Sequence, residues 1–262
     1  MPEGDTVHRS CAALHTALAG RTLTRAELRV PAYATVRLAG ATVLEVVARG
    51  KHQLTRLDNG LTLHTHLKME GTWRITGSGQ RSPGPAHQIR VILGNPAQTA
   101  FGLRLGITEL LESSREDEAV GHLGPDLLAT EFDADEALRR LRAQADRTIG
   151  EALLDQRNLA GIGTFYRAEV LFLQGIHPRT PVAAVGDLPR LVARAGQLLR
   201  ANLTRPYQVT TGNTRPGERA WVFERPGKPC RRCGTLVRTE RFGPTGQERL
   251  SYWCPSCQPA AG

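Results

Sequence analysis

The chain has 262 residues, 40% of them hydrophobic and 23% charged, which suits a folded protein of one or two domains. It has no run of about eighteen apolar residues and its start is acidic and polar, so we expect neither a membrane helix nor a signal peptide. The net charge of +9 favours a polyanionic partner, most often nucleic acid, with a solvated basic surface as the alternative.

The first predicted element is a helix over residues 3–19. Apolar residues recur at three- and four-residue steps from Val7 to Leu18, and Gly20 stands where a helix would end. Cys11 falls on this apolar stripe, so we expect a buried thiol there rather than a nucleophile.

Short segments typical of β-strands follow as far as about Phe101. The clearest lie at residues 42–48, 52–58, 61–67, 72–76 and 89–93. Asn59 and Gly60 suit a tight hairpin turn, because both residue types tolerate a positive φ. Residues 77–88 are rich in Gly, Ser and Pro and are expected to form a mobile loop. This half of the chain predicts a β-sandwich or flattened barrel that carries one helix at its front.

Two histidines stand out in the third of these strands. His64 and His66 are spaced i, i+2 and should point to one face of the strand. Two such side chains could share a metal ion, but the sequence shows no third ligand. Core or surface histidines are therefore the favoured interpretation.

Helices are predicted to dominate after a charged stretch at about residues 115–118, which suggests a linker. The helical segments are 134–144, 149–157, 164–173 and 187–202, and residues 204–229 should be largely loop. Residues 159–163 break the helical pattern, and Thr164 is a good N-cap for the helix that resumes. Glycines before a helix let a phosphate approach unpaired amides, although a Gly-x-Gly alone is a weak signal.

Four cysteines near the C-terminus have the spacing of a metal site. Cys230 and Cys233 form one Cys-x-x-Cys pair, Cys254 and Cys257 form another, and residues 234–253 separate them. This pattern is typical of a zinc ribbon, whose two turns bring four sulfurs into a tetrahedron. Disulfides are the alternative, which a reducing cytoplasm disfavours. We therefore expect one structural Zn2+.

The segment between the cysteine pairs is basic. It carries Arg238, Arg241 and Arg249, which are followed by Tyr252 and Trp253. A finger this small folds on its metal and leaves its tip free to touch a partner. A nucleic acid is the partner that suits these arginines.

Lysine is scarce, since the 34 basic residues include only Lys51, Lys68 and Lys228. An ammonium group can lose its proton and act as an acid or base, whereas a guanidinium in practice cannot. Each lysine is therefore a candidate for chemistry, with chance retention as the alternative.

The start of the chain, Met1-Pro2-Glu3-Gly4, offers a nucleophile. If Met1 is removed, Pro2 presents a secondary amine that can attack an aldehyde carbon and form an iminium. An α-amino group titrates near ~8, so about a tenth of it is neutral at pH 7, and Glu3 beside it can shuttle protons. Many chains begin in this way without such a role, so the hypothesis depends on the rest of the sequence.

Taken together, these motifs resemble the formamidopyrimidine-DNA glycosylase / endonuclease VIII family over nearly the whole chain. The matching motifs are residues 1–4, Arg49-Gly50-Lys51, His66-Leu67-Lys68-Met69-Glu70-Gly71, Asp155-Gln156, Leu159-Ala160-Gly161-Ile162-Gly163 and Tyr252-Trp253-Cys254-Pro255 with Cys257-Gln258. The first and last of these are most similar to the endonuclease VIII branch.

The resemblance implies an α+β fold in three parts. An N-terminal catalytic β-sandwich domain with a leading helix would span residues 1–117. A helical DNA-binding domain with a helix–two-turn–helix motif and a loop would span 118–229, and the zinc finger 230–262. We expect a monomer that binds damaged DNA, with a cytoplasmic, nucleoid-associated location and no membrane contact.

The resemblance also implies a bifunctional DNA glycosylase and abasic-site lyase that extrudes the damaged base before acting on it. Pro2 would attack C1′ and displace the base, leaving an iminium that eases loss of a C2′ proton and then of both phosphates. Glu3 would protonate the sugar ring oxygen and shuttle protons. Lys51 would contact a phosphate or serve as an acid, and Arg249 would grip the phosphates beside the lesion.

The other DNA contacts implied by the resemblance are Lys68, Met69, His122, Gly161, Gly163 and Thr164. Met69 stands where the purine-specific branch has a wedge that fills the hole left by the flipped base. Thr164 replaces a family asparagine that contacts phosphate, and His122 stands where an arginine is often found.

Removal of oxidised pyrimidines with β,δ-elimination at abasic sites is the leading hypothesis. The first alternative is a glycosylase for oxidised purines such as 8-oxoguanine and formamidopyrimidines. The second is a zinc-finger DNA-binding protein that has lost catalysis, prompted by Thr164 and His122. The intact Pro2-Glu3 start argues against this second alternative.

Overall fold

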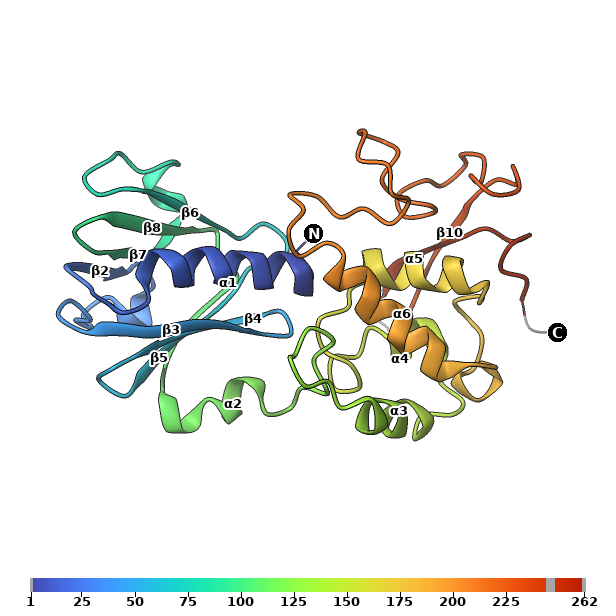
Figure 1. Ribbon diagram of the computed structural model, residues 1–262, viewed down its shortest axis with the longest axis horizontal. Coiled ribbons are helices and arrows are strands. Elements are labelled where there is room, and N and C mark those ends of the chain that lie inside the picture. Colours follow the sequence, from blue (N-terminus) through green and yellow to red (C-terminus); the bar gives the residue numbers. More distant parts are fainter. Residues whose placement is uncertain (1, 244–247, 261–262) are drawn as a thin grey trace. The chain divides into compact units, whose positions relative to one another are not determined.

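The computed structural model describes residues 2–243 and 248–260. Met1, whose removal the nucleophile hypothesis requires, lies outside the described residues. The chain divides into two compact units, Met1–His122 and Leu123–Gly262, coloured from blue to green and from green to red in Figure 1. Within the described ranges, no helix is both long and apolar enough to cross a membrane.

Two antiparallel sheets form most of the first unit. The five-stranded sheet has the order β1-β3-β4-β5-β9, and the four-stranded sheet has the order β2-β7-β8-β6. The first contains β1 (Arg21–Thr22), β3 (Thr42–Arg49), β4 (His52–Leu57), β5 (Leu61–His66) and β9 (Ile107–Glu112). The second contains β2 (Arg25–Leu28), β6 (Thr72–Gly77), β7 (Ile89–Gly94) and β8 (Gln98–Leu103). Two short 3-10 helices, η1 (Pro31–Tyr33) and η2 (Ala86–Gln88), lie in the connections.

The helix α1 (Gly4–Leu18) packs on strands of both sheets, and Figure 1 shows it running along them. Its buried residues Leu14 and Leu18 join side chains from each sheet, such as Val43 and Val91, in one core. Burying a side chain of this size stabilises the fold by about 1.5–3 kcal/mol, so the core holds helix and sheets together. The predicted β-sandwich with a leading helix is confirmed.

A buried amide ties α1 to both sheets. Gln53 of β4 donates from Nε2 to Ser10 Oγ over 3.0 Å, and Trp73 of β6 donates from Nε1 to Gln53 Oε1 over 3.1 Å. Cys11 lies in the same core, and burial raises the pKa of its thiol to about 12. The prediction of a buried thiol rather than a nucleophile is confirmed.

The turn between β4 and β5 also agrees with the sequence. Gly60 has a φ of +78°, and the Leu61 amide donates to Asn59 Oδ1 over 3.2 Å. A side chain would be strained at that φ, which explains the glycine.

The charged stretch expected to be a linker is helical instead. It forms η3 (Ser113–Arg115) and α2 (Asp117–Val120), after the strand β9 that the sequence reading missed. Glu116 fixes it to the sheet, because it pairs with Arg56 Nη2 over 2.7 Å and accepts from Thr62 Oγ1 over 2.6 Å. The charge of this stretch predicted a solvent-exposed linker, but in the structure Glu116 has partners on neighbouring strands.

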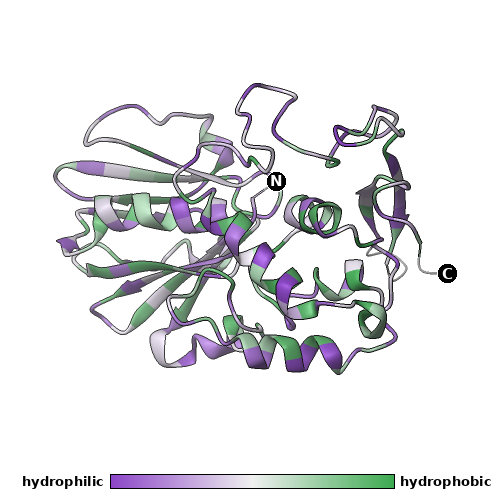
Figure 2. Ribbon diagram, turned by 45° about the vertical axis from the view of Figure 1, so that its right-hand side comes forward, coloured by the Kyte–Doolittle hydropathy of each residue, from purple (hydrophilic) through white to green (hydrophobic). Residues whose placement is uncertain are grey.

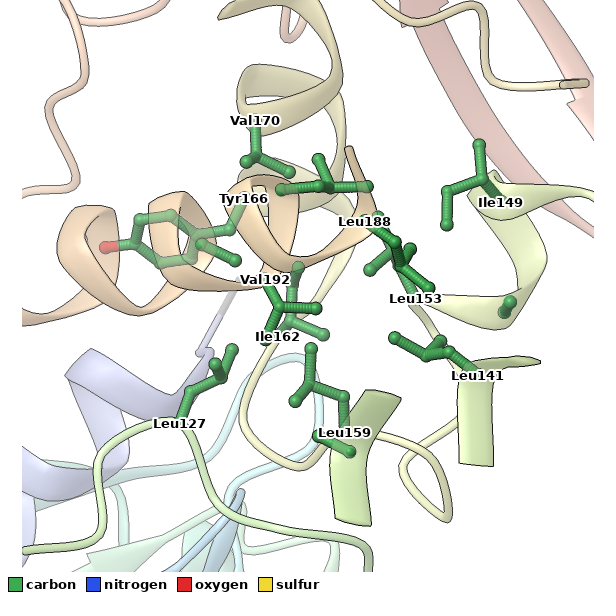
Figure 3. Close-up of a cluster of buried hydrophobic side chains, with 14 of the residues drawn as sticks. Leu127, Leu141, Ile149, Leu153, Leu159, Ile162, Tyr166, Val170, Leu188 and Val192 are labelled. Carbon is green, nitrogen blue, oxygen red and sulfur yellow. The ribbon is translucent and has the colours of Figure 1, made fainter. Parts of the chain in front are cut away.

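Helices surround the larger apolar core of the second unit. They are α3 (Ala134–Arg142), α4 (Ile149–Ala152), α5 (Thr164–Gln174) and α6 (Leu188–Arg200), with a short η4 (Val182–Ala184). Figure 3 shows one residue of each of these four helices within this core: Leu141 of α3, Ile149 of α4, Tyr166 of α5 and Val192 of α6. Figure 2 shows hydrophilic and hydrophobic residues mixed along the helices. In α3 and α6 the buried residues recur at three- and four-residue steps, which is the pattern of one buried face, whereas residues 164–172 of α5 are all buried.

The helix α4 ends at Ala152, before the predicted end at residue 157. Asn158 donates from Nδ2 to the Ala152 carbonyl over 3.0 Å, and the Arg157 amide donates to Asp155 Oδ1 over 3.1 Å. These polar side chains satisfy backbone groups that a longer helix would have paired, so the helix stops.

The start of α5 differs from the prediction as well. Gly163 is its N-cap, without a side-chain cap bond, and Thr164 is the first helical residue rather than the cap. The helix ends at Gln174, and its C-cap is Gly175, whose φ of +69° is the left-handed conformation that glycine adopts readily. In α6 the cap is Asp187, which accepts from the Arg190 amide over 2.9 Å.

The C-terminal hairpin consists of β10 (Arg238–Phe242) and β11 (Arg249–Trp253), and residues 244–247 between them lie outside the described residues. Its Tyr252 and Cys254 share a small core with Phe172 of α5 and with Val222. The finger is therefore packed on the helical unit and is not an isolated module.

Residues 204–229, all within the described ranges, form turns and bends without a helix or strand, as predicted. They are nevertheless anchored by Glu169 of α5. Its carboxylate accepts from the amides of Trp221, Val222 and Phe223 over 2.8, 3.0 and 3.0 Å. Burial raises the pKa of Glu169, and these bonds compensate the buried carboxylate.

Candidate active site and metal centre

The expected nucleophile and its neighbour lie at the beginning of α1. Pro2 is half-buried, and Glu3, the N-cap residue of the helix, is 0% exposed. The Glu3 carbonyl accepts from the Val7 amide over 3.0 Å, which fixes the first turn. A carboxyl buried beside the positive end of a helix dipole is held in one place, as a proton carrier must be.

Lys51 is presented by the tight turn between β3 and β4. Arg49 and His52 are paired across the ladder, so Gly50 and Lys51 form the two-residue connection. Gly50 has a φ of +59°, which this kind of turn requires. Lys51 is half-buried in this turn.

Four histidines gather on the Lys51 side of the first unit. The ring centroid of His52 lies 5.0 Å from that of His64, 4.9 Å from that of His66 and 6.0 Å from that of His122. Burial lowers the pKa of His52 and of His66 to about 3, and the nearby Lys68 and Lys51 contribute to both shifts. His52 and His66 are therefore neutral at neutral pH.

These histidines do not meet the geometry of a metal site. Among the described residues, only the four C-terminal cysteines come together in a group that could hold an ion. His64 instead bonds to His52 and to Glu109, a pair of partners that the sequence reading did not find. Glu109 lies opposite His64 in the pairing of β5 with β9. Because the sequence did not predict β9, it could not predict this pair.

A tight loop after β5 presents Lys68 and Met69. Lys68 has a φ of +51°, and its amide donates to His66 Nδ1 over 2.8 Å. The Gly71 amide donates to the Leu67 carbonyl over 2.8 Å, and a Cβ atom at residue 71 would lie 2.4 Å from that oxygen. The closed turn leaves Met69 66% exposed, so an apolar side chain projects into solvent.

The connection between β8 and β9 supports this loop. A Cβ atom at Gly106 would lie 2.2 Å from Lys68 Cγ, so the lysine stem rests on the glycine. Arg104, with a φ of +49°, places its Nη1 3.9 Å from Glu70 Oε2. Neither contact was predictable from the sequence.

The glycine turn of the second unit is organised by Gln156. Its Oε1 accepts from the Gly161 amide over 3.1 Å, and its Nε2 donates to the Ile162 carbonyl over 3.0 Å. Gly161 has a φ of +99°, which explains the residue type. Gly163 is buried and Thr164 is 8% exposed. The sequence pattern included Gln156 but did not reveal this role.

The four cysteines lie together as predicted. Their sulfur atoms are all within 4.8 Å of one another, with 4.0 Å between Cys230 and Cys257 and 3.4 Å between Cys233 and Cys254. A tetrahedral zinc with bonds of about 2.3 Å requires sulfurs about 3.8 Å apart, so the four thiols fit the ion. They are too far apart for disulfides, which need about 2.05 Å.

Arg249, the first residue of β11, is exposed and pairs with Phe242 in the hairpin register. Its Nη1 donates to the Glu248 carbonyl over 3.2 Å. It belongs to the second unit, whereas Pro2, Glu3 and Lys51 belong to the first.

Family models match most of the chain. The formamidopyrimidine-DNA glycosylase N-terminal domain matches residues 1–102, and the formamidopyrimidine-DNA glycosylase H2TH domain matches 123–207. A zinc finger found in FPG and IleRS matches residues 227–260. The chain belongs to the formamidopyrimidine-DNA glycosylase family.

Relatives cover the chain from end to end. "Probable endonuclease 8 2" of Streptomyces coelicolor is 54% identical, over 98% of this chain and 94% of the relative. The "DNA-(apurinic or apyrimidinic site) lyase Nei2" of Mycolicibacterium smegmatis is 48% identical over 100% of both chains. "Endonuclease 8" of Escherichia coli is 32% identical, over 98% of this chain and 100% of the relative.

Solved structures agree in fold. The Lactococcus lactis Fpg bound to DNA with an abasic site superposes with a TM-score of 0.80 and 20% identity, covering 99% of this chain and 100% of that one. A complex of the same enzyme with a THF-DNA and an inhibitor gives a TM-score of 0.82 at 21% identity, with the same coverage. At these identities the likeness supports the fold alone.

Proposed function

We propose that this DNA glycosylase and abasic-site lyase of base excision repair removes oxidised pyrimidines and uses Pro2 as its nucleophile. Family membership and relatives named endonuclease 8 and abasic-site lyase establish the class of enzyme. The observation that carries the nucleophile is the buried Glu3 next to Pro2 at the start of α1.

The reaction follows from the chemistry of a secondary amine. The Pro2 nitrogen attacks C1′ of the damaged nucleotide, the glycosidic bond breaks and the base leaves with the proton that the Pro2 nitrogen gives up. The C1′–O4′ bond then breaks as the ring oxygen is protonated, which opens the sugar and leaves an iminium between Pro2 and C1′. The resulting iminium draws electrons from C2′, so that a proton leaves there and the 3′ phosphate is eliminated. A second elimination releases the 5′ phosphate. Glu3 protonates the sugar ring oxygen and then carries protons between these steps.

The remaining site residues act on the DNA backbone in this proposal. Lys51 contacts a phosphate next to the reacting sugar or serves as an acid there, and Arg249 holds the phosphates that flank the lesion. Lys68, His122, Gly161, Gly163 and Thr164 contribute further contacts, and Met69 fills the space left by the extruded base. The rigid β3–β4 turn and the closed loop after β5 support this distribution of roles.

Each part of the chain has its own task. Residues 1–117 form the catalytic domain, residues 118–229 the helical DNA-binding domain and residues 230–262 the finger. Zinc is structural, held by Cys230, Cys233, Cys254 and Cys257, and supplies folding energy to the finger. The enzyme acts as a monomer associated with the nucleoid, which sedimentation of the purified protein and cell fractionation can test.

Borohydride trapping on duplex DNA with an abasic site tests the nucleophile. Reduction of the iminium should link the wild-type protein to DNA covalently, and Pro2→Gly should reduce this adduct strongly. Lys51→Met should impair cleavage, while Lys228→Met, a change at an exposed lysine of the other unit, should not. An undiminished adduct from Pro2→Gly would remove Pro2 from the mechanism.

A preference for oxidised purines is the second candidate, and the exposed Met69 favours it. An apolar wedge is what the purine-specific branch uses, and Met69 is 66% exposed. Competition between duplexes that contain 5-hydroxyuracil and 8-oxoguanine decides between the two. Faster excision of 8-oxoguanine would replace the pyrimidine assignment.

A further inference from the structure

A series of hydrogen-bonded side chains crosses three neighbouring strands of the five-stranded sheet. His52 Nδ1 lies 2.8 Å from His64 Nε2, and His64 Nδ1 lies 3.0 Å from Glu109 Oε2. The rings of the two histidines are nearly parallel, at 16°. His64 is 2% exposed and Glu109 is 47% exposed, so this histidine relay (Glu109, His64 and His52) joins a buried ring to solvent.

The hydrogen-bonding groups of the relay allow only one direction of donation in its neutral state. The Glu109 carboxylate only accepts, so His64 donates to it from Nδ1. A neutral His64 then has a bare Nε2, and His52 must donate to it from Nδ1. The last nitrogen, His52 Nε2, is left as an acceptor. One added proton reverses this order, because His64 then donates from Nε2 to His52 and His52 Nε2 becomes a donor.

The His52 end of the relay lies among positive and titratable groups. His66 and His122 contact its ring at centroid distances of 4.9 and 6.0 Å. The groups whose charge acts on His52 are His64, His122, Lys68 and Lys51. Both lysines disfavour a proton here. A phosphate bound beside them would offset this repulsion and make protonation of the relay easier.

We propose that DNA binding by this enzyme is coupled to the uptake of one proton by the histidine relay, which turns His52 into a hydrogen-bond donor to a DNA phosphate. The inference rests on the proposed function, because it takes the Lys51 side of the first unit as part of the DNA-binding surface. It assigns a positioning and binding role to His64 and Glu109, which no family motif of this sequence includes.

The proton balance is simple. One proton from the buffer adds to His52 Nε2, and the proton on His52 Nδ1 moves to His64 Nε2. His64 becomes an imidazolium that keeps its Nδ1–H bond to Glu109, and the Glu109 carboxylate stabilises the new charge. His52 stays neutral and now carries its hydrogen on Nε2. Since the protonated relay binds phosphate better, affinity for DNA rises as the pH falls.

Calorimetry measures this coupling directly. The zinc-loaded full chain is titrated with a duplex that holds a tetrahydrofuran abasic analogue, which cannot be cleaved. Titrations at about pH 6.5 in two buffers of different ionisation enthalpy give the number of protons taken up. We expect a measurable uptake, of up to about one proton, for the wild type, and Kd should fall by up to about tenfold per pH unit as the pH is lowered.

Three variants separate the relay from other sources of protons. His64→Gln should abolish the uptake, and Glu109→Gln, a conservative change at a half-exposed position, should reduce it even if His64→Gln folds poorly. His87→Gln, at an exposed histidine of η2, should leave it unchanged. Circular dichroism checks that each variant is folded.

The outcomes distinguish this inference from the proposed function. Tight wild-type binding without proton uptake, or equal uptake in wild type and both relay variants, would overturn the relay and leave the glycosylase assignment intact. Failure to bind the duplex together with failure of borohydride trapping would overturn the proposed function itself.

Discussion

Arg231, which lies between the first two zinc ligands, forms an ion pair through Nη1 with the carboxylate of Glu218. The same guanidinium donates from Nε to the Ala220 carbonyl over 3.0 Å and from Nη2 to the Gly217 carbonyl over 2.6 Å. One arginine on the first zinc turn therefore holds three points of the preceding loop. The metal centre and residues 210–220 form a single structural element.

Removing zinc should loosen both the finger and this loop while the first unit keeps its fold. The four thiols cannot hold their turns together without the ion, and Arg231 moves with them. A chelator should increase cleavage by a protease near residues 210–220 and lower DNA affinity, with the β-sheet signal in circular dichroism retained. Loss of the whole fold on chelation would contradict this division.

Arg231→Met should release the loop without releasing the metal. The methionine keeps an apolar stem but loses the ion pair and both hydrogen bonds, whereas the cysteines are unchanged. We expect faster proteolysis near residue 217 at a wild-type zinc content, measured with a colorimetric zinc assay. Zinc loss in this variant would show that Arg231 supports the metal site rather than the loop.

Gly71→Ala should distort the loop that carries Lys68 and Met69. The new Cβ atom would lie 2.4 Å from the Leu67 carbonyl oxygen, which belongs to the backbone and cannot rotate away. We expect a loss of about 1–3 kcal/mol in unfolding free energy and a marked fall in borohydride trapping. Gly186→Ala is the matched control, because nothing lies within 4 Å of its added atom. Wild-type trapping by Gly71→Ala would mean that the loop adapts.

Glu116→Gln should change how the stability of the first unit depends on acid. The hydrogen bond from Arg56, helped by that from Thr62, lowers the pKa of Glu116 in the folded protein. A carboxyl with a lowered pKa stabilises the fold above its unfolded pKa of about 4.3, and this contribution is lost as the pH falls through the folded value.

Melting curves of the wild type and Glu116→Gln should therefore differ at neutral pH and converge in acid. Glu131→Gln, at an exposed glutamate, should follow the wild type throughout. A constant difference between wild type and Glu116→Gln at every pH would mean that shape, not charge, explains the loss.

Elements with strong local patterns were predictable from the sequence. The apolar stripe of α1 defines a helix by itself, and the four cysteines define the metal centre by their spacing. Asn59-Gly60 indicates a hairpin because glycine readily adopts the positive φ that the turn has at Gly60. In each case the signal lies within a few residues or in a fixed spacing.

Features that depend on tertiary partners were not predictable in this way. Glu116 docks a charged stretch onto the sheet through Arg56, and Asn158 stops α4 from a position six residues further along the chain. Glu169 anchors a loop that begins far from it in the sequence. The proposed roles of Pro2, Glu3, Lys51 and Arg249 come from the family resemblance, and they stay predictions until the trapping experiments are done.

Cys11 has a consequence for chemical labelling. It is the one cysteine of the chain outside the four-sulfur group. Burial raises the pKa of its thiol to about 12, so the thiol keeps its proton at neutral pH. Maleimides and other alkylating reagents attack thiolates, so they will not modify it in the native state. Any label that the folded enzyme accepts must then have reached the finger, which makes a simple alkylation assay a selective gauge of whether zinc is in place.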